Sequence, residues 1–267
     1  MAVFAEPVSL PAAPLEIFQG VTLETEERTE PRPLRLYWVE ADLDAPGVAF
    51  EVSPGNGPEP GEASAALPAE QAREHDWQVV MNGDAFSNPD GEEPLFYTEG
   101  MPVDLLGLAV SDGETYSQPH PRFGYFYQDR QGRFAVGQGK APGDVRQAVA
   151  GFGRLIDDGK VRPTEDGKRH PRSAIGYDPK RNVLIFLVVD GRQPGVSEGA
   201  SRRELAEWLH ARGAREALNL DGGGSSLLAI RQGGRTRTLN RPVGLLNQPG
   251  TVRPVGNCVG LKARELK

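Results

Sequence analysis

Alternating apolar and polar positions run through most of the chain and predict β-strands rather than helices. Turn residues at Asp112-Gly113 and at Asp129 to Gly132 separate segments of this kind, and each predicts a hairpin. Val183 to Val189 is the most apolar strand of the chain. The other clear strand patterns are Val21 to Thr25, Leu34 to Val39, Val48 to Val52, Trp77 to Met81 and Ser173 to Tyr177.

Helical patterns are few. The clearest runs from Ser201 to Arg212, where Ser201 and Glu204 form a capping box and Gly213 follows as a residue that ends helices well. Pro68 to His75 predicts a short second helix. Asp144 to Ala150 is interpreted as one or two further helical turns.

Many strands, few helices and one strand-helix-strand unit predict an α+β fold of mixed, largely antiparallel β-sheets, with an active site at the strand ends. The two strands of that unit, before and after the Ser201 helix, are expected to be neighbours in one sheet. Val243 to Leu246 and Val255 to Leu261 are interpreted as closing strands. Residues 1–20, rich in Pro and Ala, are interpreted as an irregular lead-in to a domain over residues 21–267.

Composition excludes several classes of protein. With 38% hydrophobic and 25% charged residues among 267, the chain is expected to form a sizeable core rather than a disordered or fibrous protein. No apolar run is long enough to span a membrane. A net charge of -7 argues against a nucleic-acid partner, although nine arginines between Arg202 and Arg253 allow a locally positive site. The single Cys258 excludes an internal disulfide framework.

The stretch Asn219-Leu220-Asp221-Gly222-Gly223-Gly224-Ser225-Ser226, between two apolar runs, is the strongest local signal. Consecutive glycines add no packing and cost backbone entropy, so they indicate positive φ angles or a close approach to another group. Their N–H groups could form a concave anion site, and the polar side chains around them could add directed hydrogen bonds. A solvated tight hairpin is the alternative interpretation.

Polar residues also stand at the ends of other predicted strands, and together they have the inventory for glycosyl chemistry, namely carboxylates, arginine and an oxyanion cradle. Each alone is typical of a turn. The set comprises Asn82, Asp84, Arg172, Asp190, Arg192, Asn219, Asp221 and Ser225.

Three other chemistries have little support. The four histidines are far apart and no cysteine cluster exists, so a zinc site is not expected, although carboxylates beside a phosphate could hold Mg²⁺ or Ca²⁺. Gly195-Val196-Ser197-Glu198-Gly199 has the letters of a nucleophile elbow, but it does not leave a strand directly and no histidine follows His210. The glycine turn lacks the Lys of a nucleotide-binding loop.

Several of these motifs, in this order, resemble the phosphodiester glycosidase domain family of the N-acetylglucosamine-1-phosphodiester alpha-N-acetylglucosaminidase type, which has bacterial exopolysaccharide-associated relatives. The most specific are His170-Pro171-Arg172-Ser173-Ala174-Ile175-Gly176 and the glycine turn itself. The resemblance also covers Met81 to Phe86, Val188 to Arg192, Ser197 to Gly199 and Arg253 to Asn257. It implies hydrolysis of a sugar joined through its anomeric carbon to a phosphodiester, without a cofactor.

On this resemblance we expect roles for thirteen residues. Asp190 and Asp221 are expected to face the anomeric carbon, with Glu198 as a substitute for either. A phosphate would be held by Arg172, Ser225, Ser226 and the amides of Gly222, Gly223 and Gly224, near Arg192. Asn82, Asp84 and Asn219 would bind sugar hydroxyls.

The alternative function is a non-catalytic glycan-binding module with the same fold. The expected partner in either case is a small or polymeric glycan of the cell envelope or of an exopolysaccharide, and the sequence leaves the oligomeric state open. The family resemblance implies a secreted or periplasmic protein, although residues 1–7 lack the basic and apolar regions of a signal peptide.

Overall fold

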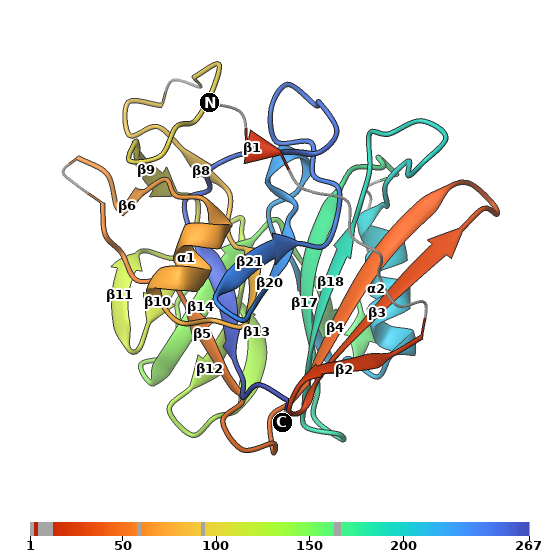
Figure 1. The fold of residues 1–267 in the computed structure, drawn as a ribbon. Coiled ribbons are helices and arrows are strands. Elements are labelled where there is room, and N and C mark those ends of the chain that lie inside the picture. Colours follow the sequence, from red (N-terminus) through yellow and green to blue (C-terminus); the bar gives the residue numbers. More distant parts are fainter. Residues whose placement is uncertain (1–2, 5–12, 58–59, 92–93, 163–166, 267) are drawn as a thin grey trace.

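The computed structural model describes residues 3–4, 13–57, 60–91, 94–162 and 167–266, and its sheets are antiparallel throughout (Figure 1). An eight-stranded sheet is the largest. Its order is β16-β15-β19-β17-β18-β4-β3-β2. The strands are β2 (Leu15–Phe18), β3 (Val21–Arg28), β4 (Leu34–Asp42), β15 (Gly153–Asp157), β16 (Lys160–Val161), β17 (Arg172–Asp178), β18 (Val183–Val189) and β19 (Glu216–Asn219).

Two five-stranded sheets pack beside it, with orders β21-β20-β7-β23-β5 and β11-β10-β14-β12-β13. The first contains β5 (Ala49–Val52), β7 (Val79–Asn82), β20 (Leu228–Gln232), β21 (Arg235–Thr238) and β23 (Cys258–Lys262). The second contains β10 (Ala109–Ser111), β11 (Glu114–Ser117), β12 (Gly124–Asp129), β13 (Phe134–Gln138) and β14 (Val145–Gly151). Smaller sheets join β6 (Ala63–Ser64), β8 (Phe86–Ser87) and β9 (Pro102–Leu105), and β1 (Val3–Phe4) with β22 (Thr251–Val252).

The central strand β18 of the eight-stranded sheet is buried on both faces. Phe186 of β18 packs into the core shared with the two five-stranded sheets, whereas Ile185 and Leu187 pack toward helix α2 (Arg202–Ala211). This explains why the β18 segment is continuously apolar instead of alternating. In Figure 1, α2 covers the outer face of this sheet on the right, and α1 (Pro68–Glu74) lies on the other side of the molecule.

The Ser201 helix has the predicted capping box. The Ser201 hydroxyl accepts from the Glu204 N–H at 3.2 Å, and the Glu204 carboxylate accepts from the Ser201 N–H at 2.9 Å. One prediction about this unit is wrong. β18 and β19, which α2 connects, belong to one sheet but are not neighbours, because β17 lies between them and pairs antiparallel with both. β17 forms antiparallel hydrogen bonds with β18 on one side and β19 on the other, so β18 and β19 need not pair with each other as parallel strands.

Three further expectations differ from the structure. Asp144 to Ala150 is not helical, because this segment pairs with β12 as the central strand β14. Val243 to Leu246 forms only isolated bridges. Within residues 1–20, β1 and β2 are strands, β2 extending the large sheet, while residues 1–2 and 5–12 lie outside the described part of the chain. These segments are short, so their partners rather than their own patterns decide their structure.

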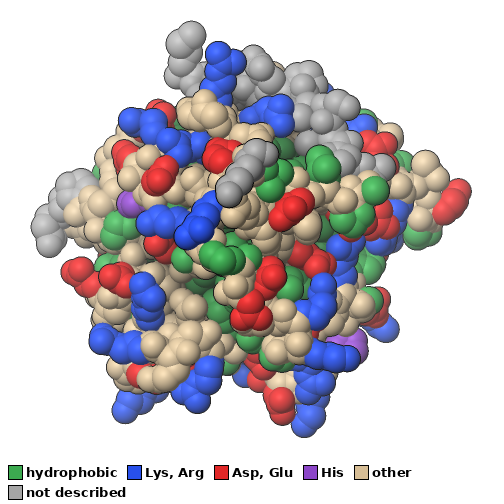
Figure 2. Space-filling model, turned by 60° about the horizontal axis from the view of Figure 1, so that its bottom comes forward, with side chains coloured by type: hydrophobic (Ala, Val, Ile, Leu, Met, Phe, Trp, Pro, Cys, Tyr) green, Lys and Arg blue, Asp and Glu red, His purple; other side chains and the backbone are tan. Residues whose placement is uncertain are grey.

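The charged side chains do not separate into large single-sign regions on the face shown in Figure 2, where acidic and basic groups are interspersed. Within the described residues, no helix is long and apolar enough to cross a membrane. Of the nine arginines between Arg202 and Arg253, Arg253 lines a cavity, together with Arg172 and Arg192 from earlier in the chain.

Candidate active site

A cavity of about 300 Å³ opens beside the glycine turn that joins β19 to β20. The residues around it come from segments that are far apart in the sequence but meet at one end of β17. They are Phe152, His170, Arg172, Arg192, Asp221, Gly222, Gly223, Gly224 and Arg253. The sequence had placed most of these residues in one site, and tertiary structure brings them to a single cavity.

The three glycines allow close backbone approach rather than leaving three free amides. The Gly222 N–H donates to Asp221 Oδ1 at 2.8 Å, and the Gly223 N–H donates to the Pro171 carbonyl at 2.9 Å. Gly223 has φ of +61°, and a Cβ on Gly222 would lie 2.8 Å from the Pro171 carbonyl oxygen. Two of the amides expected to cradle an anion are therefore already used inside the protein.

Of the described residues that line the cavity, Asp221 is the one with a carboxylate. Its exposed fraction is 9%. Burial raises the pKa of its carboxyl group. The nearby Arg253 guanidinium, whose Nη2 lies 3.6 Å from Asp221 Oδ2, and a hydrogen bond from Ser225 oppose this rise. Asp221 is thus a buried carboxyl group beside a guanidinium group, and its burial strengthens its interaction with any charge that develops nearby.

Three guanidinium groups converge on the cavity. Arg172, at the start of β17, is held by the Ala200 carbonyl, which accepts from its Nε at 3.1 Å. Arg192 has a left-handed backbone with φ of +57° and donates to Asn247 Oδ1 at 2.7 Å. Burial, followed by the charge of Arg253, lowers the pKa of Arg192. Planar guanidinium groups match the oxygen geometry of phosphate and carboxylate, so the cavity suits an anionic ligand.

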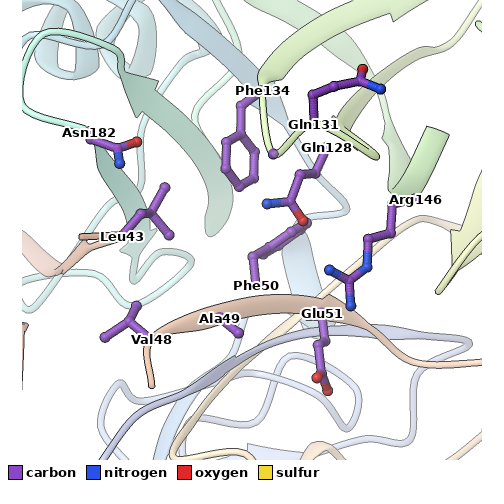
Figure 3. A pocket seen from close by; sticks show the side chains of 11 residues that line it. Leu43, Val48, Ala49, Phe50, Glu51, Gln128, Gln131, Phe134, Arg146 and Asn182 are labelled. Carbon is purple, nitrogen blue, oxygen red and sulfur yellow. The ribbon is translucent and has the colours of Figure 1, made fainter. Parts of the chain in front are cut away.

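A second, larger cavity of about 370 Å³ lies near the other end of β17, where Asn182 is part of its wall. Figure 3 shows Phe50, Phe134 and Gln128 around it, with the Glu51 side chain directed away. The Glu51 carboxylate instead accepts from Trp77 Nε1 at 2.8 Å and pairs with Lys262. Because this cavity gathers no comparable set of charged groups, the glycine-turn cavity is the better candidate for chemistry.

The part of the chain that the structure describes contains no cluster of metal ligands. No group of three or more His, Cys, Asp or Glu side chains lies close enough to hold an ion. The expectation that Mg²⁺ or Ca²⁺ could bind beside a phosphate would rest on Asp221 and ligand oxygens, so it stays a prediction.

Comparison with known protein families decides the relationship. A family model described as phosphodiester glycosidase matches residues 75–262, well over half of the chain. The protein belongs to the phosphodiester glycosidase family. The match contains every residue that lines the candidate cavity. A search of curated proteins found no match to this chain.

Solved structures share the fold at low sequence identity. The catalytic domain of zebrafish N-acetylglucosamine-1-phosphodiester alpha-N-acetylglucosaminidase, auto-inhibited by its pro-peptide, is 20% identical, with a TM-score of 0.65, and the match covers 99% of this chain and 89% of that one. A hypothetical protein from Synechocystis is 17% identical, with a TM-score of 0.60 and 92% of this chain matched. This chain spans 62% of the length of the Synechocystis protein.

A third similar structure is a putative exported protein from Burkholderia pseudomallei. It is 16% identical, with a TM-score of 0.58, and the match covers 86% of this chain and 74% of that one. At these identities the likeness establishes a common fold.

Several residues proposed from the family resemblance lie behind the cavity and hold its wall together. Asn82 donates to the Asp221 carbonyl at 2.9 Å and accepts from the Ser173 hydroxyl at 2.6 Å. Asn219 is fully buried and donates to the Leu220 carbonyl at 2.9 Å. With these bonds Asn82 joins β7, β17 and the glycine turn, whereas among the described residues the Asn219 amide bonds only to the adjacent residue. Neither side chain lines the cavity, and their contact with sugar hydroxyls stays a prediction.

Ser225 and Ser226 also lie behind the cavity lining. The Ser225 hydroxyl accepts from Arg253 Nε at 3.1 Å and from Arg253 Nη2 at 2.5 Å, so it positions that guanidinium. Ser226 is buried, and its hydroxyl has no hydrogen-bond partner among the described residues. Neither serine lines the cavity, so their contact with a phosphate stays a prediction.

Asp84 is fully buried beneath the site, where one oxygen accepts from the Ala85 N–H at 2.8 Å and the other has no hydrogen-bond partner in the described structure. Burial raises the pKa of Asp84 to about 8, and the Asp221 carboxylate adds to the rise. Asp84 is therefore protonated at neutral pH and cannot serve as a second negative charge there.

Asp190 and Glu198, the other two carboxylates proposed as catalytic, are outside the cavity. Asp190 is buried and accepts from the Tyr37 hydroxyl at 2.9 Å, from Asn240 Nδ2 at 3.1 Å and from the Arg241 N–H at 3.0 Å. The Glu198 side chain is 42% exposed and lies 3.6 Å from Arg169. The geometry favours a structural role for Asp190 and a surface position for Glu198.

Replacing Asp190 with Ala is expected to lower the free energy of unfolding by about 3 kcal/mol, because it removes the acceptor of the buried Tyr37 hydroxyl, the buried Asn240 amide and the Arg241 backbone N–H. Glu198→Ala is the matched control and should change stability by less than about 0.5 kcal/mol. Urea denaturation measures both. A folded, fully stable Asp190→Ala protein without turnover would instead make Asp190 catalytic.

The cavity contains three residues to which the sequence analysis gave no role, namely Phe152, His170 and Arg253. His170 and Arg253 lie inside motifs that carry the family resemblance, so that signal could have found them. Phe152 stands between two glycines, in a segment whose strand pairing was not predicted.

Proposed function

We propose that this protein is a hydrolase that cleaves the bond between the anomeric carbon of a sugar and the oxygen of a phosphodiester. The family is one of phosphodiester glycosidases, which supports a glycosidase at the family level. The zebrafish enzyme with the same fold is named for this type of reaction.

The observation that carries the proposal is the composition of the cavity, which has three guanidinium groups and one carboxylate among its described residues. Hydrolysis of an ordinary glycoside uses two carboxyl groups, one that protonates the alkoxide leaving group and one that attacks the sugar or activates water. A phosphate monoester loses its second proton near pH 6, so it can leave as an anion when cationic groups stabilise it. The cavity therefore suits a glycosyl phosphate better than a simple glycoside.

In the proposed reaction, Arg172, Arg192 and Arg253 hold the phosphate oxygens. The bond from the anomeric carbon to the phosphate oxygen breaks, and the electron pair leaves with the phosphate monoester. Asp221 faces the anomeric carbon and stabilises the positive charge that develops there. Water then supplies its oxygen to that carbon and loses a proton to solvent, which releases the free sugar.

We also propose that the substrate is a cell-envelope or exopolysaccharide glycan and that the protein acts outside the cytoplasm. The support is the shared fold with a protein described as a putative exported protein. Fractionation of the native host should find the protein in the periplasm or the medium, and a purely cytoplasmic signal would contradict this part of the proposal.

A substrate screen tests the reaction. Sugar 1-phosphodiesters and aryl glycosides of the same sugars are incubated with the protein, and released sugar is measured. We expect release from the phosphodiesters, at a rate at least about a hundredfold above that from the glycosides, the order of effect of one lost electrostatic contact. No cleavage of either, together with saturable glycan binding, would support a non-catalytic module instead.

A further inference from the structure

Phe152 is the large apolar side chain in a cavity that is otherwise lined by charged groups, a histidine and glycines. It connects β14 to β15, directly between Gly151 and Gly153. Phe152 is 38% exposed, although aromatic rings of this size usually gain from burial. An exposed phenylalanine at the wall of a cavity is a feature that a ligand with an apolar face would cover.

Backbone contacts fix Phe152 close to Asp221. A Cβ on Gly151 would lie 2.2 Å from the Asn219 carbonyl oxygen, so only glycine permits this approach to the segment that leads into Asp221. Gly153 pairs with Asn219 in the sheet. Arg202 Nη1 donates to the Phe152 carbonyl at 3.2 Å.

The ring is supported on one side by other aromatic groups. Phe123 meets Phe152 with ring centroids 5.7 Å apart at an interplanar angle of 81°, and His120 lies 4.8 Å from Phe123. This edge-to-face arrangement leaves part of the Phe152 ring open to the cavity, next to the guanidinium groups. The site thus has a part lined by guanidinium groups and an adjacent aromatic surface.

We infer that Phe152 is a specificity-determining residue that contacts the apolar C–H face of the sugar ring while the arginines hold the phosphate. The inference rests on the proposed function. A sugar 1-phosphate has both required parts within one small molecule, because its anionic group is joined directly to a ring with hydroxyl edges and a C–H face. Inorganic phosphate has only the first part, so Phe152 should distinguish the two ligands.

Calorimetric titration of the full chain tests this inference, with inorganic phosphate, α-glucose 1-phosphate and N-acetyl-α-glucosamine 1-phosphate as probes. Phe152→Ala should weaken binding of the tighter sugar 1-phosphate about tenfold, which corresponds to about 1.4 kcal/mol, and leave phosphate affinity unchanged. Phe152→Trp should retain the affinity for the sugar ligand. Leu15→Ala is the control and should change neither affinity. It removes an apolar side chain of β2 that is 53% exposed.

Each other outcome overturns the inference. Equal losses for phosphate and sugar 1-phosphate would mean that Phe152 only supports the arginines, and no loss for either would mean that the ring makes no ligand contact. Equal binding of all three probes by the unmodified protein would also exclude an apolar sugar contact. Failure of the proposed function gives a different result. Selective binding of sugar 1-phosphate, without hydrolysis of sugar 1-phosphodiesters, would support the Phe152 contact and contradict the hydrolase.

Discussion

Replacing Asp221 with Asn is expected to lower kcat for a sugar 1-phosphodiester by roughly 10³-fold or more, while the protein stays folded. Asp221 is the carboxylate in the described cavity lining, so its loss removes the negative charge that the proposed mechanism places opposite the anomeric carbon. Asn can still accept the hydrogen bond from the Gly222 N–H, which Asp221 Oδ1 now receives at 2.8 Å. Steady-state kinetics and a thermal melt measure the two effects.

The same substitution should strengthen binding of inorganic phosphate, because Asp221 repels anions and partly neutralises Arg253. Asp178→Asn is the matched control. Asp178 is a buried aspartate at the opposite end of β17 from Arg172, and its Oδ2 accepts from Arg181 Nε at 2.7 Å. Asp178→Asn should keep wild-type kcat. An Asp221→Asn protein with near wild-type turnover would remove Asp221 from the mechanism.

Replacing Asp84 with Asn should remove a fall in stability with pH that we expect in the natural protein. Burial, with the Asp221 and Glu62 carboxylates adding to it, raises the pKa of Asp84 from 3.8 to about 8. Between these values the folded state holds a proton that the unfolded chain has lost. The stabilisation is complete below about pH 4 and is lost as pH rises toward 8, by about 1.4 kcal/mol per pH unit.

Urea denaturation between pH 4.5 and 8 measures this slope. Asn resembles the neutral carboxylic acid in shape, so Asp84→Asn should show a flatter dependence over the whole range. Asp190→Asn is the comparison, because burial raises the pKa of Asp190 only to about 6, and its effect should end near that pH. Equal slopes above pH 6 for the natural protein and Asp84→Asn would show that Asp84 is ionised in the folded state.

Local patterns predicted the helices and most strands because their determinants lie within a few residues. The Ser201 capping box, the two hairpin turns and the apolar β18 segment are of this kind. The residues of β14 suit a helix or a strand, and pairing with β10 and β12 makes the segment a strand. Sheet order depends on contacts between distant segments, which explains why the position of β17 between β18 and β19 was not foreseen.

The sequence by itself indicated the family, the predominance of β-strands and the glycine turn that borders the candidate cavity, because motifs and short-range periodicity lie in consecutive residues. Only the tertiary structure decided which polar residues reach the cavity. Asp190 and Asp221 both follow apolar strands, yet Asp190 bonds to Tyr37 and Asn240 whereas Asp221 lines a cavity together with three arginines. The physical reason is that the direction of a side chain after a strand depends on the partners that packing brings to it, and these come from remote parts of the chain.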